Sequence, residues 1–181
     1  MVISRFYKYV FCENPKAASR SLARTLMDDY LGEPYCLHQH GIVVPKEFSN
    51  YFKFSSVRLP YERIVSQWHF STTRMGKTFS FEEYLEFLQP TVPDKLFESY
   101  NGWEFATYSQ LERLTVGKFD YILKYENLKS DFEKLPFVKE STIQEARYPG
   151  NYDDWQNTNE SKDLIYKWAF EDFKKYKYEK H

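Results

Sequence analysis

Hydrophobic and polar positions along the chain predict short strands that alternate with helices. Aromatic and β-branched residues fill residues 5–12, and the run ends at Asn14-Pro15, as is typical of a strand. Leu22, Leu26 and Tyr30 then recur at helical spacing. The same patterns predict further strands over residues 52–57 and 119–124, and helices over residues 19–31, 60–70, 80–88, 107–114, 127–135 and 160–176.

This alternation is typical of βαβ units. We therefore expect one α/β domain over residues 1–181, with a central parallel sheet and helices on both of its faces. Ser80 and Glu83 have the spacing of a capping box at the start of a helix. The polar residues 71–77 predict a mobile segment, and residues 136–157 predict irregular structure. Ligands of such sheets bind beyond the carboxyl ends of the strands.

A short loop of small residues joins the first predicted strand to the first helix. Its sequence is Pro15-Lys16-Ala17-Ala18-Ser19-Arg20-Ser21-Leu22. Such a loop exposes several backbone N–H groups at the positive end of a helix, which suits a phosphate. Lys16 adds a positive charge, and Ser19 and Ser21 add hydroxyl donors. The pattern predicts a phosphate-binding strand, loop and helix like those of P-loop proteins.

A second candidate anion site follows the strand over residues 52–57. Arg58 stands at the end of that strand, and Ser66 lies two turns into the next predicted helix. Both side chains can converge on one phosphate. Two anion sites at neighbouring strand-to-helix junctions indicate a ligand with two separated phosphates.

At these positions the chain resembles the sulfotransferases that use 3′-phosphoadenosine 5′-phosphosulfate (PAPS), most of all the carbohydrate branch with the uronyl 2-O-sulfotransferases. The resemblance rests on the loop described above and on Phe54-Ser55-Ser56-Val57-Arg58-Leu59-Pro60-Tyr61-Glu62-Arg63-Ile64-Val65-Ser66. Residues 119–128 and 166–173 match two further family patterns. The four motifs occur in the family's order and span almost the whole chain. The resemblance implies transfer of a sulfuryl group from PAPS to a hydroxyl acceptor, a small molecule or an oligosaccharide.

The resemblance also implies roles for the residues of the two anion sites. Lys16 would neutralise the oxygen that bridges phosphate and sulfate, and Arg58 with Ser66 would bind the 3′-phosphate. The 5′-phosphate would be held by the loop and the first helical turn, that is by Lys16, Ala17, Ala18, Ser19, Arg20 and Ser21. For Arg20, a phosphate contact and a surface charge are both open. Ala18 departs from the glycine that the family often has, although some 2-O-type members carry alanine.

Two histidines lie between the two anion motifs. His40 is the candidate general base, because a histidine titrates near neutrality and related 2-O-sulfotransferases have a histidine in this segment. In an extended chain His38 would point the same way and line the same cleft. The alternative for each is a structural or exposed histidine. A metal site would need a third ligand, and none is evident. The departing group already carries phosphate and needs no metal, so we expect no metal.

Some side chains near the motifs have two open interpretations. Arg63 fits a nucleotide contact as well as a salt bridge with Glu126. Arg147 stands where the family often supplies another basic contact. Arg74 and Lys77 could meet an anionic sugar or belong to a solvated loop.

Composition narrows the classes of function. The formal net charge of −1 over 181 residues argues against a nucleic-acid binder. No window approaches the roughly 20 apolar residues of a membrane span, and the N-terminus lacks a signal-peptide layout. We expect a cytoplasmic protein, or a lumenal one if an anchor has been removed. Cys12 and Cys36 do not have the sequence spacing of a metal or redox site, and we expect Cys12 to be a buried free thiol.

Two other functions compete with sulfuryl transfer. The first is a small P-loop-like nucleotide kinase, although Lys16 precedes the small residues instead of following them and Gly-x-x-x-x-Gly-Lys-Ser/Thr is absent. The second is a catalytically inactive module that keeps the nucleotide pocket. Preference for ATP would favour the kinase, and binding without transfer would favour the inactive module.

Overall fold

The computed structural model describes residues 1–35, 44–75, 80–88, 118–143 and 158–180. The chain forms two compact units. Unit 1 consists of Met1–Arg58 and Glu112–Tyr148, and unit 2 consists of Leu59–Leu111 and Pro149–His181. That residues 1–181 act as a single domain stays a prediction.

Unit 1 is built on a five-stranded sheet in the order β3-β1-β2-β4-β5. Strands β2, β4 and β5 are parallel, whereas β1 is antiparallel to both β2 and β3. The bounds of the strands are β1 Val2–Ser4, β2 Tyr9–Phe11, β3 Glu33–Pro34, β4 Phe52–Val57 and β5 Tyr121–Lys124. The expected α/β class is confirmed, and the sheet is mixed with a parallel part instead of parallel throughout.

The strand predicted over residues 5–12 is wrong in its first half. Residues 5–8 form the turn of a hairpin between β1 and β2, in which Lys8 has a φ of 55° and Tyr7 N donates to Ser4 Oγ. Phe6 is 72% exposed at this turn. Aromatic residues favour strands, but the backbone reversal here places two of them on a turn, and β1 was not predicted.

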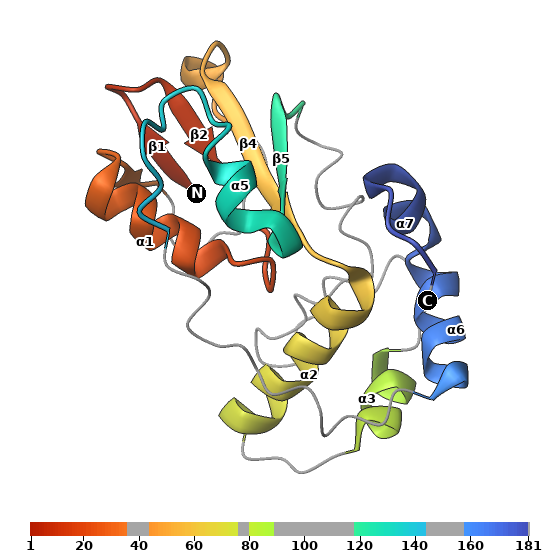
Figure 1. Ribbon diagram of the computed structural model, residues 1–181. Helices are drawn as coiled ribbons and strands as arrows, with labels where there is room; N and C mark the ends of the chain where they lie inside the picture. Colours follow the sequence, from red (N-terminus) through yellow and green to blue (C-terminus); the bar gives the residue numbers. More distant parts are fainter. Residues whose placement is uncertain (36–43, 76–79, 89–117, 144–157, 181) are drawn as a thin grey trace. The chain divides into compact units, whose positions relative to one another are not determined.

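Helices α1 and α5 pack against one face of the sheet (Figure 1). Helix α1 spans Ser19–Asp29, and α5 spans Leu128–Phe132 after a 3₁₀ turn, η3, at Tyr125–Asn127. The buried residues of this face include Tyr9, Phe11, Leu22, Leu26, Phe54, Leu123 and Phe132. The opposite face packs Ile3, Val10 and Cys12 against Phe48, which lies in the 3₁₀ turn η1 (Lys46–Phe48). The helix predicted over 127–135 is therefore shorter than expected.

The end of α1 is fixed by the backbone and by a buried tyrosine. Tyr9 Oη donates to the carbonyls of Leu26 and Tyr30, and Gly32 N donates to Leu26 O at 2.9 Å. Leu31 takes the left-handed conformation, with a φ of 52°. The left-handed Leu31 and the hydrogen bond from Gly32 N form the chain reversal that is typical of a helix C-terminus. Helix α1 therefore ends close to its predicted end.

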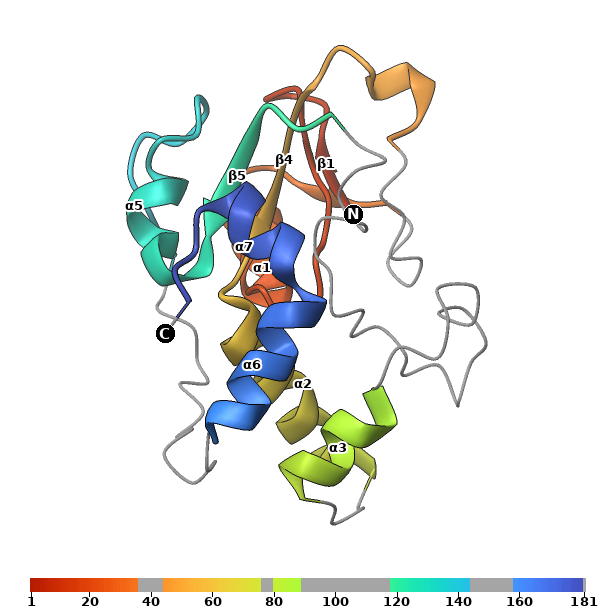
Figure 2. The same cartoon turned by 90° about the vertical axis from the view of Figure 1, so that its right-hand side faces the viewer.

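Unit 2 consists of helices in its described part. Helix α2 spans Pro60–Met75, α3 spans Phe81–Leu88, α6 spans Asn159–Trp168, and α7 spans Phe170–Tyr176. Helices α3 and α6 contact α2, and α7 contacts α6 (Figure 2). The core of the unit packs Tyr61 against Phe173 and Trp68 against Phe81.

Three predictions in unit 2 have clear outcomes. The capping box is confirmed, because Ser80 N donates to Glu83 Oε2 at 2.7 Å and Glu83 N donates to Ser80 Oγ at 3.2 Å. The prediction that α2 ends near residue 70 is wrong, since the helix continues through the polar residues to Met75. The single helix predicted over 160–176 is interrupted at Ala169. The helix predicted over 107–114 lies outside the described residues. Among the described helices, none has both the length and the apolar character that a membrane crossing requires.

Candidate functional site at the carboxyl edge of the sheet

The loop between β2 and α1 has a backbone conformation that suits an anion. Lys16 has a φ of 67° and Ala18 a φ of 62°, both in the left-handed region that non-glycine residues seldom adopt. Each such residue costs about 1–3 kcal/mol and persists only where the surroundings impose it. Left-handed residues in a turn bring successive N–H groups to one side and create an anion-binding concavity. Ala17 is fully buried, whereas Lys16 is partly exposed.

The first turn of α1 lacks side-chain capping. Its N-cap residue is Ala18, no side chain caps it, and no acidic residue occupies the turn. The first N–H groups of a helix have no partner within the helix, and the helix dipole makes this end positive. Ser19 and Ser21 are partly exposed here, and Arg20 is exposed. The loop and this turn together offer backbone donors, hydroxyls and positive charge at one place.

Buried hydrogen bonds hold the loop against β4. Asn14 Nδ2 donates to Ser56 O at 2.8 Å, Ser55 Oγ donates to Cys12 O at 2.7 Å, and Ser56 Oγ donates to Ala17 O at 2.5 Å. The side chains of Asn14, Ser55 and Ser56 are all 0% exposed. The loop is thus attached to the strand that ends at Arg58.

Arg58 lies at the same edge of the sheet. Strands β2, β4 and β5 are parallel, so their carboxyl ends meet at one edge, as Figure 1 shows. Phe54 and Ser56 alternate with their neighbours and point toward the α1 side, and Arg58 has the same parity. Two strand residues span about 7 Å, so Arg58 follows closely after the Ser56–Ala17 contact.

The guanidinium of Arg58 rests on an aromatic ring from the neighbouring strand end. The register pairs Val57 with Lys124, which brings the next residues, Arg58 and Tyr125, side by side. The Cζ atom of Arg58 lies 4.0 Å from the centroid of the Tyr125 ring. Arg58 is only 3% exposed. Cation–π contacts of buried cations are the strongest of their kind, so the ring holds this side chain in place.

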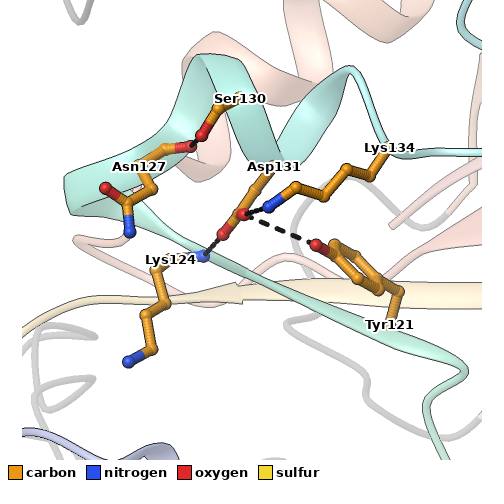
Figure 3. A network of polar contacts seen from close by, with 6 residues as sticks. All are labelled: Tyr121, Lys124, Asn127, Ser130, Asp131 and Lys134. Atoms are coloured by element: carbon orange, nitrogen blue, oxygen red, sulfur yellow. Dashed lines mark hydrogen bonds and ion pairs between the residues drawn. The ribbon is translucent and has the colours of Figure 1, made fainter.

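A polar network fixes the turn that carries Tyr125 (Figure 3). The carboxylate of Asp131 accepts a bond from Lys124 N at 2.8 Å and one from Lys134 Nζ at 2.7 Å. Tyr121 Oη also donates to Asp131, at 3.4 Å. Burial and the neighbouring carboxylate raise the pKa of Tyr121, and the hydrogen bond to Asp131 raises the pKa of Lys134. The network keeps the corner between β5 and α5 in one conformation.

The structure brings together part of the predicted site. Lys16, Ala17, Ala18, Ser19, Arg20 and Ser21 form the loop and first turn, and Arg58 belongs to the same unit. Ser66 lies in α2 of unit 2, so its convergence with Arg58 stays a prediction. Arg63 is buried in α2, and both interpretations of it stay predictions.

The remaining candidates have other outcomes. His38, His40, Arg147 and Lys77 lie outside the described residues, and the Arg74 side chain does too. Cys12 is confirmed as a buried free thiol, and burial raises its pKa to about 12. Within the parts of the chain that the structure describes, no three His, Cys, Asp or Glu side chains gather as a metal site.

Sequence reasoning gave no role to Asn14, Ser55, Ser56 or Tyr125. The signal for the serines was present, because two polar residues side by side are unusual in a central parallel strand that is buried on both faces. The partner of Tyr125 follows from the strand register, which the sequence does not specify.

The model of the sulfotransferase family matches residues 1–179 of the chain. No curated protein and no solved structure matches.

Proposed function

The chain belongs to the sulfotransferase family, and we propose that it moves the sulfuryl group of PAPS to a hydroxyl of a carbohydrate acceptor. The observation that carries this proposal is the pairing of two anion-binding features at one edge of one sheet. The loop with Lys16 and the buried Arg58 belong to the same unit, and Ser56 connects them. A nucleotide with phosphates at both its 5′ and 3′ positions matches this pair better than a nucleotide with a single phosphate chain.

The loop would hold the 5′ end of the donor. The N–H groups of residues 18–21 would bind its phosphate oxygens, because the first turn of α1 has no side-chain cap, whereas the N–H of Ala17 already donates to Asn14 O at 3.3 Å. The hydroxyls of Ser19 and Ser21 would add donors. The left-handed conformations of Lys16 and Ala18 are supported by the buried contacts with β4, so these donors are arranged before the ligand arrives.

Arg58 would bind the 3′-phosphate, with Ser66 as the second ligand. A guanidinium presents a planar pair of donors to a phosphate and also stacks on aromatic faces. The contact with Tyr125 at 4.0 Å is of this kind. Ser66 would contribute its hydroxyl from α2.

His40 would act as the general base of the transfer. It would take the proton from the acceptor hydroxyl while that oxygen forms its bond to sulfur and the bond from sulfur to the bridging oxygen breaks. Lys16 would neutralise the charge that develops on the departing phosphate, and His38 would line the same cleft. As in phosphoryl transfer, the protein contributes mainly alignment and electrostatic stabilisation.

Calorimetric titration and a transfer assay test the proposal. Adenosine 3′,5′-bisphosphate should bind the full chain at least about tenfold more tightly than ATP, since only the former places phosphates at both sites. Preference for ATP would support the kinase instead. Labelled sulfate should then pass from PAPS to members of a panel of carbohydrate hydroxyls, in the presence of EDTA as well. Binding of the bisphosphate without transfer to any acceptor would leave the inactive module as the function.

A further inference from the structure

The contact between β4 and the loop that joins β2 to α1 includes buried side-chain hydrogen bonds. Its three hydrogen bonds come from the side chains of Asn14, Ser55 and Ser56. They reach Cys12 at the start of the loop, Ala17 near its end and the backbone of β4 itself. All three side chains are fully buried. The loop is therefore attached to β4 at both of its ends.

Ser56 connects the loop to the strand that leads to Arg58. Ser56 binds the loop through its hydroxyl and through its carbonyl, and Arg58 follows two residues later. An apolar residue at this place would pack equally well in a buried parallel strand. The buried Ser56 hydroxyl needs a hydrogen-bond partner, because a buried polar group without one is costly. The carbonyl of Ala17, where the loop now lies, is that partner.

The second anion site, at Arg58, is also held in place by neighbouring residues. The Tyr125 ring holds the Arg58 guanidinium, and Asp131 holds the backbone of Lys124 directly before Tyr125. The separation between loop and guanidinium is therefore set by buried contacts on both sides, before any ligand binds.

We propose that Ser56, supported by Ser55 and Asn14, is a positioning residue that sets the separation of the two anion sites, so that the protein selects nucleotides by the distance between their two phosphates. This inference rests on the proposed function, because it takes the loop and Arg58 as the ligands of the 5′- and 3′-phosphates. Two sites held rigidly at the correct spacing bind a two-phosphate ligand more tightly than either site binds a single phosphate, because binding at one site brings the second phosphate to the other. If the contact between the loop and β4 is loosened, this gain in affinity is lost and each site keeps only its own affinity.

The test compares three ligands on the full chain by calorimetry: adenosine 5′-monophosphate, adenosine 3′-monophosphate and adenosine 3′,5′-bisphosphate. In the Ser56→Ala variant the affinity for the bisphosphate should fall about tenfold, as expected for loss of one buried hydrogen bond. The affinities for the two monophosphates should change less than about twofold, within the spread of such measurements. Ser55→Ala should show the same pattern.

Two further variants separate positioning from folding. Ser4→Ala is the matched control, because it also removes a hydrogen bond of a fully buried serine in unit 1, the one that Ser4 Oγ accepts from Tyr7 N at 3.2 Å in the hairpin turn. It should leave all three affinities unchanged. Ser56→Thr keeps the hydroxyl and should restore the preference for the bisphosphate. If Ser56→Ala does not fold, Ser55→Ala and Ser56→Thr carry the test.

The outcomes that overturn the inference differ from the one that overturns the proposed function. Equal weakening of the 5′-monophosphate and the bisphosphate in Ser56→Ala would show that the serine only maintains the loop. Unchanged binding of all three ligands would show that it has no part in the site. In both cases wild-type binding of the bisphosphate would stand, and the proposed function with it. A wild-type protein that binds the bisphosphate no better than the monophosphates would overturn both.

Discussion

Replacing Tyr125 with leucine should weaken binding of adenosine 3′,5′-bisphosphate without affecting adenosine 5′-monophosphate. The ring of Tyr125 lies 4.0 Å from Arg58 Cζ, and Arg58 is 3% exposed. A cation–π contact is worth about 0.5–1 kcal/mol at the surface and about 2 kcal/mol or more when the cation is desolvated. The burial of Arg58 places this contact at the upper end of that range.

The effect on binding follows from this magnitude. Leucine keeps an apolar side chain beside Arg58 but presents no π face, so the guanidinium loses the ring contact that helps to orient it. If re-ordering Arg58 for the 3′-phosphate costs the whole of about 2 kcal/mol, the dissociation constant of the bisphosphate rises about 30-fold. The 5′-monophosphate has no group for Arg58 and should bind as before.

Calorimetry on the wild type, Tyr125→Leu and Tyr125→Phe measures both ligands. Phenylalanine keeps the ring, so Tyr125→Phe should bind the bisphosphate within about twofold of the wild type. The reasoning is refuted if the leucine variant binds the bisphosphate as tightly as the wild type. It is equally refuted if phenylalanine weakens binding as much as leucine does, because the hydroxyl would then be the important group.

Four further changes test other parts of the molecule. Arg58→Ala should raise the dissociation constant of the bisphosphate about 10- to 100-fold while turnover at saturating PAPS changes little; a variant that loses mainly turnover contradicts its assignment. His40→Ala should lower turnover about 10²- to 10⁴-fold with bisphosphate affinity intact, and normal turnover removes His40 from the mechanism. Gly32→Ala should lower the free energy of unfolding by about 1–3 kcal/mol, measured in urea, because a Cβ would lie 2.6 Å from Val2 Cγ1 and 2.7 Å from a carbonyl; a variant as stable as the wild type would disprove this close packing. Burial raises the pKa of Cys12 to about 12 in the folded state, whereas an unfolded thiol ionises near 8.5. The unfolded state therefore releases this proton first, and stability should fall between about pH 9 and pH 12 by up to about 1.4 kcal/mol per pH unit. Cys12→Ala should reduce this slope, and an unchanged slope would assign it to other groups.

Local sequence patterns predicted the elements that local physics determines. The loop of small residues before α1, the β4 strand before Arg58 and the Ser80–Glu83 capping box each depend on neighbouring residues, and the structure has all three. The errors arose where contacts distant in sequence decide the outcome. The hairpin turn at residues 5–8 is aromatic and yet exposed, because β1 pairs with β2 and the chain must reverse between them.

The helix boundaries show a related limit. Residues 71–75 contain neither glycine nor proline, and α2 continues through them to Met75, the residue before Gly76. At Ala169 the reverse happens, since the sequence there has good helix formers and the backbone departs from helical geometry, with a φ of −102° and a ψ of 21°. Ala169 is 1% exposed within the core of unit 2. Propensity is a weak influence of less than about 1 kcal/mol per residue, and packing overrides it.

In the candidate site, too, the features that depend on neighbouring residues could be predicted and those that depend on distant contacts could not. The candidate anion site in the loop at Lys16 and the position of Arg58 at a strand end could be predicted from the sequence, because each needs only its own strand-to-helix junction. The connection between the two sites could not, because it depends on Ser56 meeting Ala17 across the sheet. What the sequence did contain was an anomaly, a pair of adjacent serines where a buried parallel strand usually has apolar residues on both faces. Buried hydroxyls need partners, and here those partners lie in the adjacent loop. An unexplained polar pair in such a strand therefore indicates where a neighbouring loop is attached, even when the sequence does not identify that loop.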